Sequence, residues 1–135
     1  MEIQIINNQT IKRLMTAFPG SFINDNMEFI ADSRINSYFR LGDVPSETIL
    51  KAKVIEYFSR PSFKGEYYRS QKKNQEIYDF HLRGLNEFLG TNFTPEEIED
   101  IYCKLGNGIN RPLTLKFIES GYDMQVVRRN EENKN

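Results

Sequence analysis

One short run constrains the fold of the second half of the chain. Thr94, Pro95, Glu96 and Glu97 form the pattern that begins a helix: Thr is the N-cap, Pro takes the first helical position, and Glu97 closes a capping box. Apolar residues then recur at helical spacing, so that one face is buried; they are Ile98, Ile101, Tyr102 and Leu105. We expect Gly106 to end this helix in a left-handed conformation.

The loop that follows, residues 106–110, has the sequence GNGIN and is rich in glycine, as phosphate-binding loops are. However, a phosphate loop requires GxxxxGK followed by Ser or Thr after a strand, and a dinucleotide fingerprint requires GxGxxG after a strand. GNGIN follows a helix and matches neither pattern. We therefore interpret it as the turn of an αα-hairpin, whose second helix starts at Asn110 or Arg111 and ends at Ser120-Gly121.

The first half of the chain alternates between strand and helix patterns. Three of residues 2–6 are the β-branched residue Ile, which predicts a strand or an extended arm, and a helix follows from Asn8 or Thr10 to Phe18. Two aromatic-rich runs, 27–31 and 37–41, then predict a β-hairpin around a polar loop. These patterns place a small sheet near the N-terminus.

Two further helices are expected in the middle of the chain. Ser46 caps the first, which must stop near Ser59 because Pro61 restricts the residue before it. The second runs from about residue 66 to residue 89, and Gly84 inside it indicates close packing of a neighbour.

Together these patterns predict an α+β fold: a mainly helical single domain of four or five helices with a small antiparallel β-hairpin or sheet. We expect residues 1–127 to form the domain and residues 128–135 to be a polar, disordered tail.

The totals exclude several classes of protein. The chain has 135 residues and a formal net charge of −1, so it does not attract DNA or membranes as a whole. A single Cys rules out an internal disulfide, and neither a signal peptide nor a long apolar segment is evident. We expect a cytoplasmic protein.

Candidate chemistry is sparse. His81, the sole histidine, lies in the apolar half of a helix and is expected to be packed, and Cys103 lies mid-helix and is expected to be inert. The crowded carboxylates at the start of the helix after Thr94 suit the helix dipole, and Asp25, Glu28 and Asp32 lack the register of a calcium loop. The sequence therefore predicts no catalytic residue, no metal site and no cofactor, and hence a protein that is not an enzyme.

The most informative segment for function is residues 60–75, RPSFKGEYYRSQKKNQ, which interleaves cations with aromatic rings. Such a mixture suits single-stranded nucleic acid, because cations contact phosphates while rings stack on bases. It equally suits a protein interface, where Tyr and Arg are favoured, or a solvated face. The candidate binding residues are Arg60, Phe63, Lys64, Tyr67, Tyr68, Arg69, Lys72 and Lys73.

The runs FLGTNF, LGNGIN and FIESGYD, in this order, together with MEFIADSRINSYFRL, resemble small uncharacterised proteins encoded by phages and prophages of Gram-positive bacteria. The resemblance covers about residues 18–124 and implies a protein of the host cell cytoplasm, with no catalytic residues to transfer. We therefore expect a non-enzymatic interaction protein that binds a host or phage macromolecule. One version inhibits a nucleic-acid-handling host factor such as a CRISPR-type defence nuclease. The alternative is a nucleic-acid-binding accessory protein in phage replication, recombination or gene control.

Overall fold

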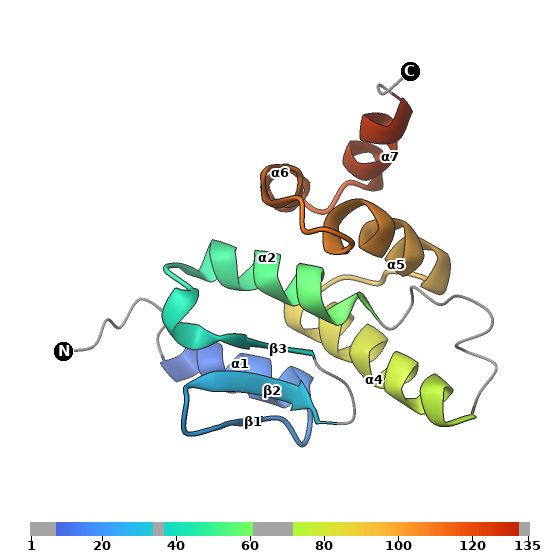
Figure 1. Cartoon of the computed structure of the whole chain (residues 1–135). Helices are drawn as coiled ribbons and strands as arrows, with labels where there is room; N and C mark the ends of the chain where they lie inside the picture. Colours follow the sequence, from blue (N-terminus) through green and yellow to red (C-terminus); the bar gives the residue numbers. More distant parts are fainter. Residues whose placement is uncertain (1–7, 34–36, 61–71, 133–135) are drawn as a thin grey trace.

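A computed structural model describes residues 8–33, 37–60 and 72–132 (Figure 1). The fold is α+β and mainly helical, as predicted, with a small antiparallel sheet near the N-terminus. In chain order the elements are α1 (Asn8–Ala17), β1 (Phe22–Ile23), β2 (Glu28–Asp32), β3 (Ser37–Arg40), the 3₁₀ turn η1 (Leu41–Asp43), α2 (Glu47–Phe58), α4 (Lys72–Leu89), α5 (Pro95–Ile101), the π-helical turn η3 (Tyr102–Gly106), α6 (Arg111–Glu119) and α7 (Met124–Glu132). The predicted strand at residues 2–6 lies outside the described residues.

Six α-helices occur among the described residues, one more than the upper expectation. The additional helix is α7, which continues to Glu132 and so occupies part of the segment that was expected to be a disordered tail. Arg128 on α7 donates two hydrogen bonds of 3.3 Å to Asp100 on α5, which ties this helix to the rest of the fold.

The sheet has the order β1-β2-β3, with both pairs antiparallel. The predicted hairpin is β2 and β3, whereas β1 was not expected. Side chains alternate between the two faces, so Phe29 and Phe39 pair on the inner face and are buried. Ile30 and Tyr38 pair on the outer face, toward solvent.

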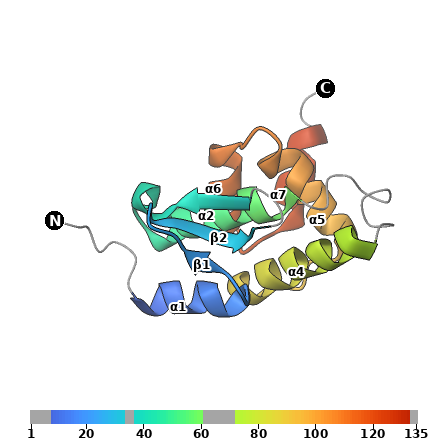
Figure 2. The same cartoon turned by 60° about the horizontal axis from the view of Figure 1, so that its bottom comes forward.

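The helices among the described residues lie on the inner face of the sheet. Figure 2 shows α1 on the side of β1, while α2 packs against β3. Helix α2 lies between the sheet and the C-terminal helices, and it contacts α6 and η3 on its other side (Figure 1). An aromatic cluster fills the space between the sheet and α4, with Phe18 and Phe58 at its centre. Helix α2 is therefore buried on two sides. Its remaining, surface-exposed face is held in position by the sheet on one side and by η3 and α6 on the other.

His81 belongs to this core, as the apolar spacing predicted. Its side chain is only 1% exposed, and its ring centroid lies 5.5 Å from those of Phe58 and Phe80. His81 is therefore a buried member of the aromatic core.

The caps expected from the sequence are present at three helix starts. Ser46 accepts a hydrogen bond from the Ile49 amide at 3.2 Å, and Asn110 accepts one from the Leu113 amide at 3.3 Å. Thr94 forms the complete capping box with Glu97. Because each cap satisfies amides that the helix leaves without a partner, these residues fix where α2, α5 and α6 begin.

Gly106 does not have the role that the sequence suggested. It ends a π-helical turn, and the left-handed residues of the loop are Gly108 (φ 98°) and Ile109 (φ 49°). A Cβ atom at Gly106 would lie 3.1 Å from both the Glu56 carbonyl oxygen and the Ser59 hydroxyl. Gly106 is therefore required for the close approach of η3 to α2, and the loop itself is the turn between η3 and α6.

A buried ion pair joins α2 to the start of α6. Glu56 is fully buried, and its carboxylate accepts hydrogen bonds of 2.8 Å from both Nε and Nη2 of Arg111. These bonds raise the pKa of the Arg111 guanidinium above its ordinary value, although partial burial acts in the opposite direction. Arg111 is therefore charged throughout the physiological pH range, and the pair links α2 to the first residue of α6.

Candidate functional site

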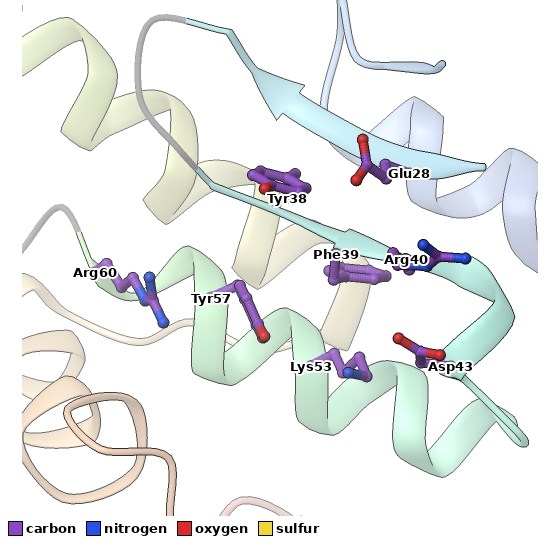
Figure 3. Close-up of a pocket in the computed structure, with 8 residues that line it drawn as sticks. All are labelled: Glu28, Tyr38, Phe39, Arg40, Asp43, Lys53, Tyr57 and Arg60. Atoms are coloured by element: carbon purple, nitrogen blue, oxygen red, sulfur yellow. The ribbon is translucent and has the colours of Figure 1, made fainter. Parts of the chain in front are cut away.

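A groove of about 450 Å³ opens on the surface between β3 and α2 (Figure 3). Its walls come from the sheet on one side and from one face of α2 on the other. The residues that line it are Glu28, Tyr38, Phe39, Arg40, Asp43, Lys53, Tyr57 and Arg60.

Local structure explains why these side chains converge. Lys53 and Tyr57 are four residues apart and therefore share the face of α2 that is turned away from the core, and Arg60 follows two residues after the end of this helix. Tyr38 and Arg40 are two residues apart on β3 and therefore point to the same side of the sheet. The groove is thus lined by side chains at helical spacing on α2 and by side chains at strand spacing on β3, two elements that are separated in the sequence.

The ring of Tyr57 makes cation–π contacts with the two cations on the α2 side of the groove. The guanidinium carbon of Arg60 lies 4.8 Å from the centroid of this ring, and Nζ of Lys53 lies 5.8 Å from it. Phe39 packs against the same ring at 5.9 Å between centroids. Cation–π contacts of this kind contribute about 0.5–1 kcal/mol each at exposed sites, and here they hold both cations beside the groove.

The cations of the groove form no ion pair with a residue of the described ranges. Within the described ranges, the ion pairs are Arg13–Glu47, Arg111–Glu56 and Arg128–Asp100, and none of them involves a residue of the groove. Arg40, Lys53 and Arg60 can therefore bind an incoming carboxylate or phosphate without first losing a carboxylate of the described part of the chain.

The groove also contains negative charge. Glu28 and Asp43 line it, and Glu28 accepts a hydrogen bond of 2.6 Å from the side-chain amide of Asn24. The lining is therefore mixed in sign, with three cations and two carboxylates.

The outer face of the sheet extends this surface. The strand register places Phe22, Ile30 and Tyr38 in one row across β1, β2 and β3. Phe22 is 46% exposed and Tyr38 is 39% exposed, and Met27 at the β1–β2 turn is 55% exposed. The row meets the groove at Tyr38, so charged and apolar surfaces are continuous there.

The structure places part of the segment predicted to bind a partner. Arg60 lines the groove, and Lys72 is exposed at the start of α4. The side chain of Lys73 is outside the described residues, as are four further candidates and Phe63; the four are Lys64, Tyr67, Tyr68 and Arg69.

Sequence reasoning missed the residues that surround Arg60, namely Tyr38, Arg40, Lys53 and Tyr57. The spacing of Lys53, Tyr57 and Arg60 is visible in the sequence, but it does not show which exposed face would form a binding site. Only the packing of β3 against α2 distinguishes it.

The other chemical candidates have structural roles or exposed positions. Glu97 closes the capping box, Asp100 binds Arg128, and Cys103 is exposed on η3. Across the described ranges, no three or more His, Cys, Asp or Glu side chains form a group that could hold a metal ion.

No helix in the described part of the chain combines the length and the apolar character needed to cross a membrane. Comparison with known proteins gives no match to a family model, to a curated protein or to a solved structure. The function must therefore be inferred from the geometry of the groove.

Proposed function

We propose that the protein is a non-enzymatic interaction protein of phage type, which binds a host or phage macromolecule through the groove between β3 and α2. The observation that carries this proposal is the set of cations around Tyr57, which have no carboxylate partner among the described residues. Such groups are available for a ligand, and the adjoining Tyr and Arg side chains are of the types enriched at binding hot spots.

The mixed charge of the groove favours a protein as the partner. Glu28 and Asp43 would repel a phosphate backbone, whereas a protein surface can present carboxylates to the cations and donors to these two residues. The exposed Phe22, Met27 and Tyr38 add the apolar and aromatic area that protein interfaces use. The proposed partner is therefore a protein with an acidic segment, encountered in the host cell cytoplasm.

The resemblance to phage proteins suggests a concrete version of this proposal. A small protein with an exposed binding surface can act by covering the working surface of a larger one. The partner would then be a nucleic-acid-handling host factor, for instance a CRISPR-type defence nuclease, whose activity falls when the groove is occupied.

One observation favours a second candidate, a nucleic-acid-binding accessory protein. Tyr38 and the partly buried Tyr57 line the groove together with Arg40, Lys53 and Arg60, and single-stranded bases stack on rings that lie beside cations in this way. Binding to a nucleic acid would weaken steeply with added salt, because each phosphate contact releases counterions. Binding to a protein would persist in a lysate treated with nuclease.

The double substitution Lys53→Ala with Arg60→Ala tests the groove directly. We expect it to lower partner capture from host lysate about tenfold or more, because two hot-spot cations are lost. A tenfold loss of affinity corresponds to about 1.4 kcal/mol of binding free energy. The measurement is a tagged pull-down with and without nuclease, quantified by mass spectrometry.

The matched control is Lys116→Ala with Arg128→Ala, which removes the same charge from α6 and α7. It should capture the partner as well as the unchanged protein does. Equal capture by both double variants would contradict a role for the groove, and capture that disappears with nuclease would favour the nucleic-acid candidate.

A separate variant tests the segment beyond Arg60. Replacing Arg69, Lys72 and Lys73 with Ala should reduce capture by a further severalfold if the binding surface continues from the groove into this segment. Unchanged capture and an unchanged thermal unfolding temperature would confine the surface to the groove and the sheet.

A further inference from the structure

The groove runs along an edge of the sheet. Among the described residues, β3 pairs only with β2, and its other side faces α2 across the groove (Figure 3). An edge strand presents backbone N–H and C=O groups that can pair with another chain. The question is which residues of β3 present them.

The backbone hydrogen bonds between β3 and β2 identify the residues of β3 whose N–H and C=O groups are directed away from β2. The amide of Leu41, directly after β3, donates to the Met27 carbonyl at 2.9 Å. In an antiparallel pair, residues alternate between those bonded to the neighbouring strand and those directed away from it. The backbone groups of Phe39 are therefore directed toward β2, whereas those of Tyr38 and the N–H of Arg40 are directed toward the groove; the carbonyl of Arg40, the N-cap of η1, accepts the first bond of that turn.

The opposite strand agrees with this assignment. Glu28, which lies across from Arg40, has its carbonyl bonded to the amide of Asn24 at 3.1 Å, on the β1 side. Glu28 and Arg40 are thus a pair without mutual backbone hydrogen bonds. The N–H of Arg40 is therefore directed to the edge of β3 that no described strand pairs with.

We propose that the partner contributes an extended acidic segment, which adds as a further strand along the Tyr38–Arg40 edge of β3. This inference rests on the proposed function and specifies how the partner binds. Backbone hydrogen bonds supply part of the affinity in β-strand addition, and the side chains on either side supply the specificity. The groove offers both in one place.

The chemistry of the two walls defines the side chains of this segment. Side chains of an added strand alternate between the two faces of the sheet. Those on the inner face meet Lys53 and Arg60 beside the Tyr57 ring, which favours Glu or Asp. Those on the outer face lie beside Tyr38, which favours apolar residues. The preferred segment therefore alternates acidic and apolar residues.

The substitution Arg40→Pro tests the backbone contact. Arg40 has φ −85°, close to the value that proline requires, and the preceding Phe39 is extended, so the backbone accommodates the ring. Proline removes the edge N–H of residue 40 without touching the bonds to β2. Arg40→Ala is the matched control, because it removes the guanidinium and keeps the N–H.

The probe is an acetylated and amidated peptide of alternating Val and Glu, with oligo-dT as the comparison ligand. We expect Arg40→Pro to bind the peptide roughly fivefold more weakly than Arg40→Ala does, as expected for one backbone hydrogen bond. Thermal unfolding of both variants establishes that the fold is kept. In the unchanged protein, bound peptide should slow amide exchange at Tyr38 and Arg40, whereas Phe39 and Leu41 are already protected.

The outcomes separate this inference from the proposed function. Peptide that shifts the NMR signals of Lys53 and Arg60 without slowing exchange at Tyr38 and Arg40 would overturn strand addition and leave the groove as a binding site. Groove signals that respond to oligo-dT alone would overturn both the acidic segment and the protein partner. Groove signals that respond to neither probe would overturn the groove as a site for either ligand.

Discussion

Replacing Arg111 with Ala should lower the free energy of unfolding by about 3 kcal/mol. Glu56 would then be a fully buried carboxylate without its cation, and removal of one partner from a buried pair costs about 3–5 kcal/mol. We expect the lower end of that range because the Arg111 side chain is 32% exposed, so water can reach part of the vacated space. Urea unfolding followed by circular dichroism measures the change.

The control for this prediction is Arg128→Ala, which breaks a pair whose two side chains are 43% and 47% exposed. Its cost should stay below about 1 kcal/mol, as for other surface pairs. Changing both Glu56 and Arg111 to Met should recover much of the lost stability, because no buried charge remains. If Arg111→Ala and Arg128→Ala lower the free energy of unfolding equally, the Glu56–Arg111 pair contributes no more to stability than a surface ion pair does.

Gly84→Ala should also destabilise the fold, by about 2 kcal/mol or more, although Ala is the better helix former. The added Cβ would lie 2.2 Å from Cε1 of Phe18, whose ring is fully buried in the aromatic cluster. Overpacking of this kind costs about 1–3 kcal/mol or more, which exceeds the gain of about 1 kcal/mol in helix propensity. The thermal unfolding temperature measures the balance.

Gly42→Ala is the matched control, because a Cβ at Gly42 has no neighbour within 4 Å. It should leave stability almost unchanged. Combining Gly84→Ala with Phe18→Leu should cost less than the sum of the two single changes, because the smaller side chain makes room for the methyl group. A stabilising effect of Gly84→Ala alone would show that Phe18 can move aside freely.

Sequence-local signals predicted much of the fold. Ser46, Thr94 and Asn110 could be recognised as helix starts because each side chain accepts a hydrogen bond from the amide three residues later. A pattern of neighbouring residues is enough to predict such a contact. The close neighbour expected at Gly84 is confirmed as Phe18. What such patterns cannot specify is a contact that exists only after distant elements pack.

The features that the sequence analysis predicted wrongly or missed depend on contacts between elements that are distant in the sequence. Gly106 has the spacing of a C-cap, but its conformation is set by the approach of η3 to Glu56 and Ser59, about fifty residues earlier in the chain. Strand β1 has only two residues and is stabilised by pairing with β2. The groove likewise requires β3 and α2 side by side, so only Arg60 among its residues was selected in advance.

The ion pair between Glu56 and Arg111 has a consequence for the order in which the protein forms during synthesis. Arg111 follows Glu56 by 55 residues, and ribosomes add about 5–20 residues per second, so roughly 3–11 s separate the two. During that interval α2 has neither its cation nor the helix α6 that packs on it. A nascent chain therefore gains the buried ion pair and the α6 contact of α2 only after Arg111 has been added, later than β3 and α2 themselves.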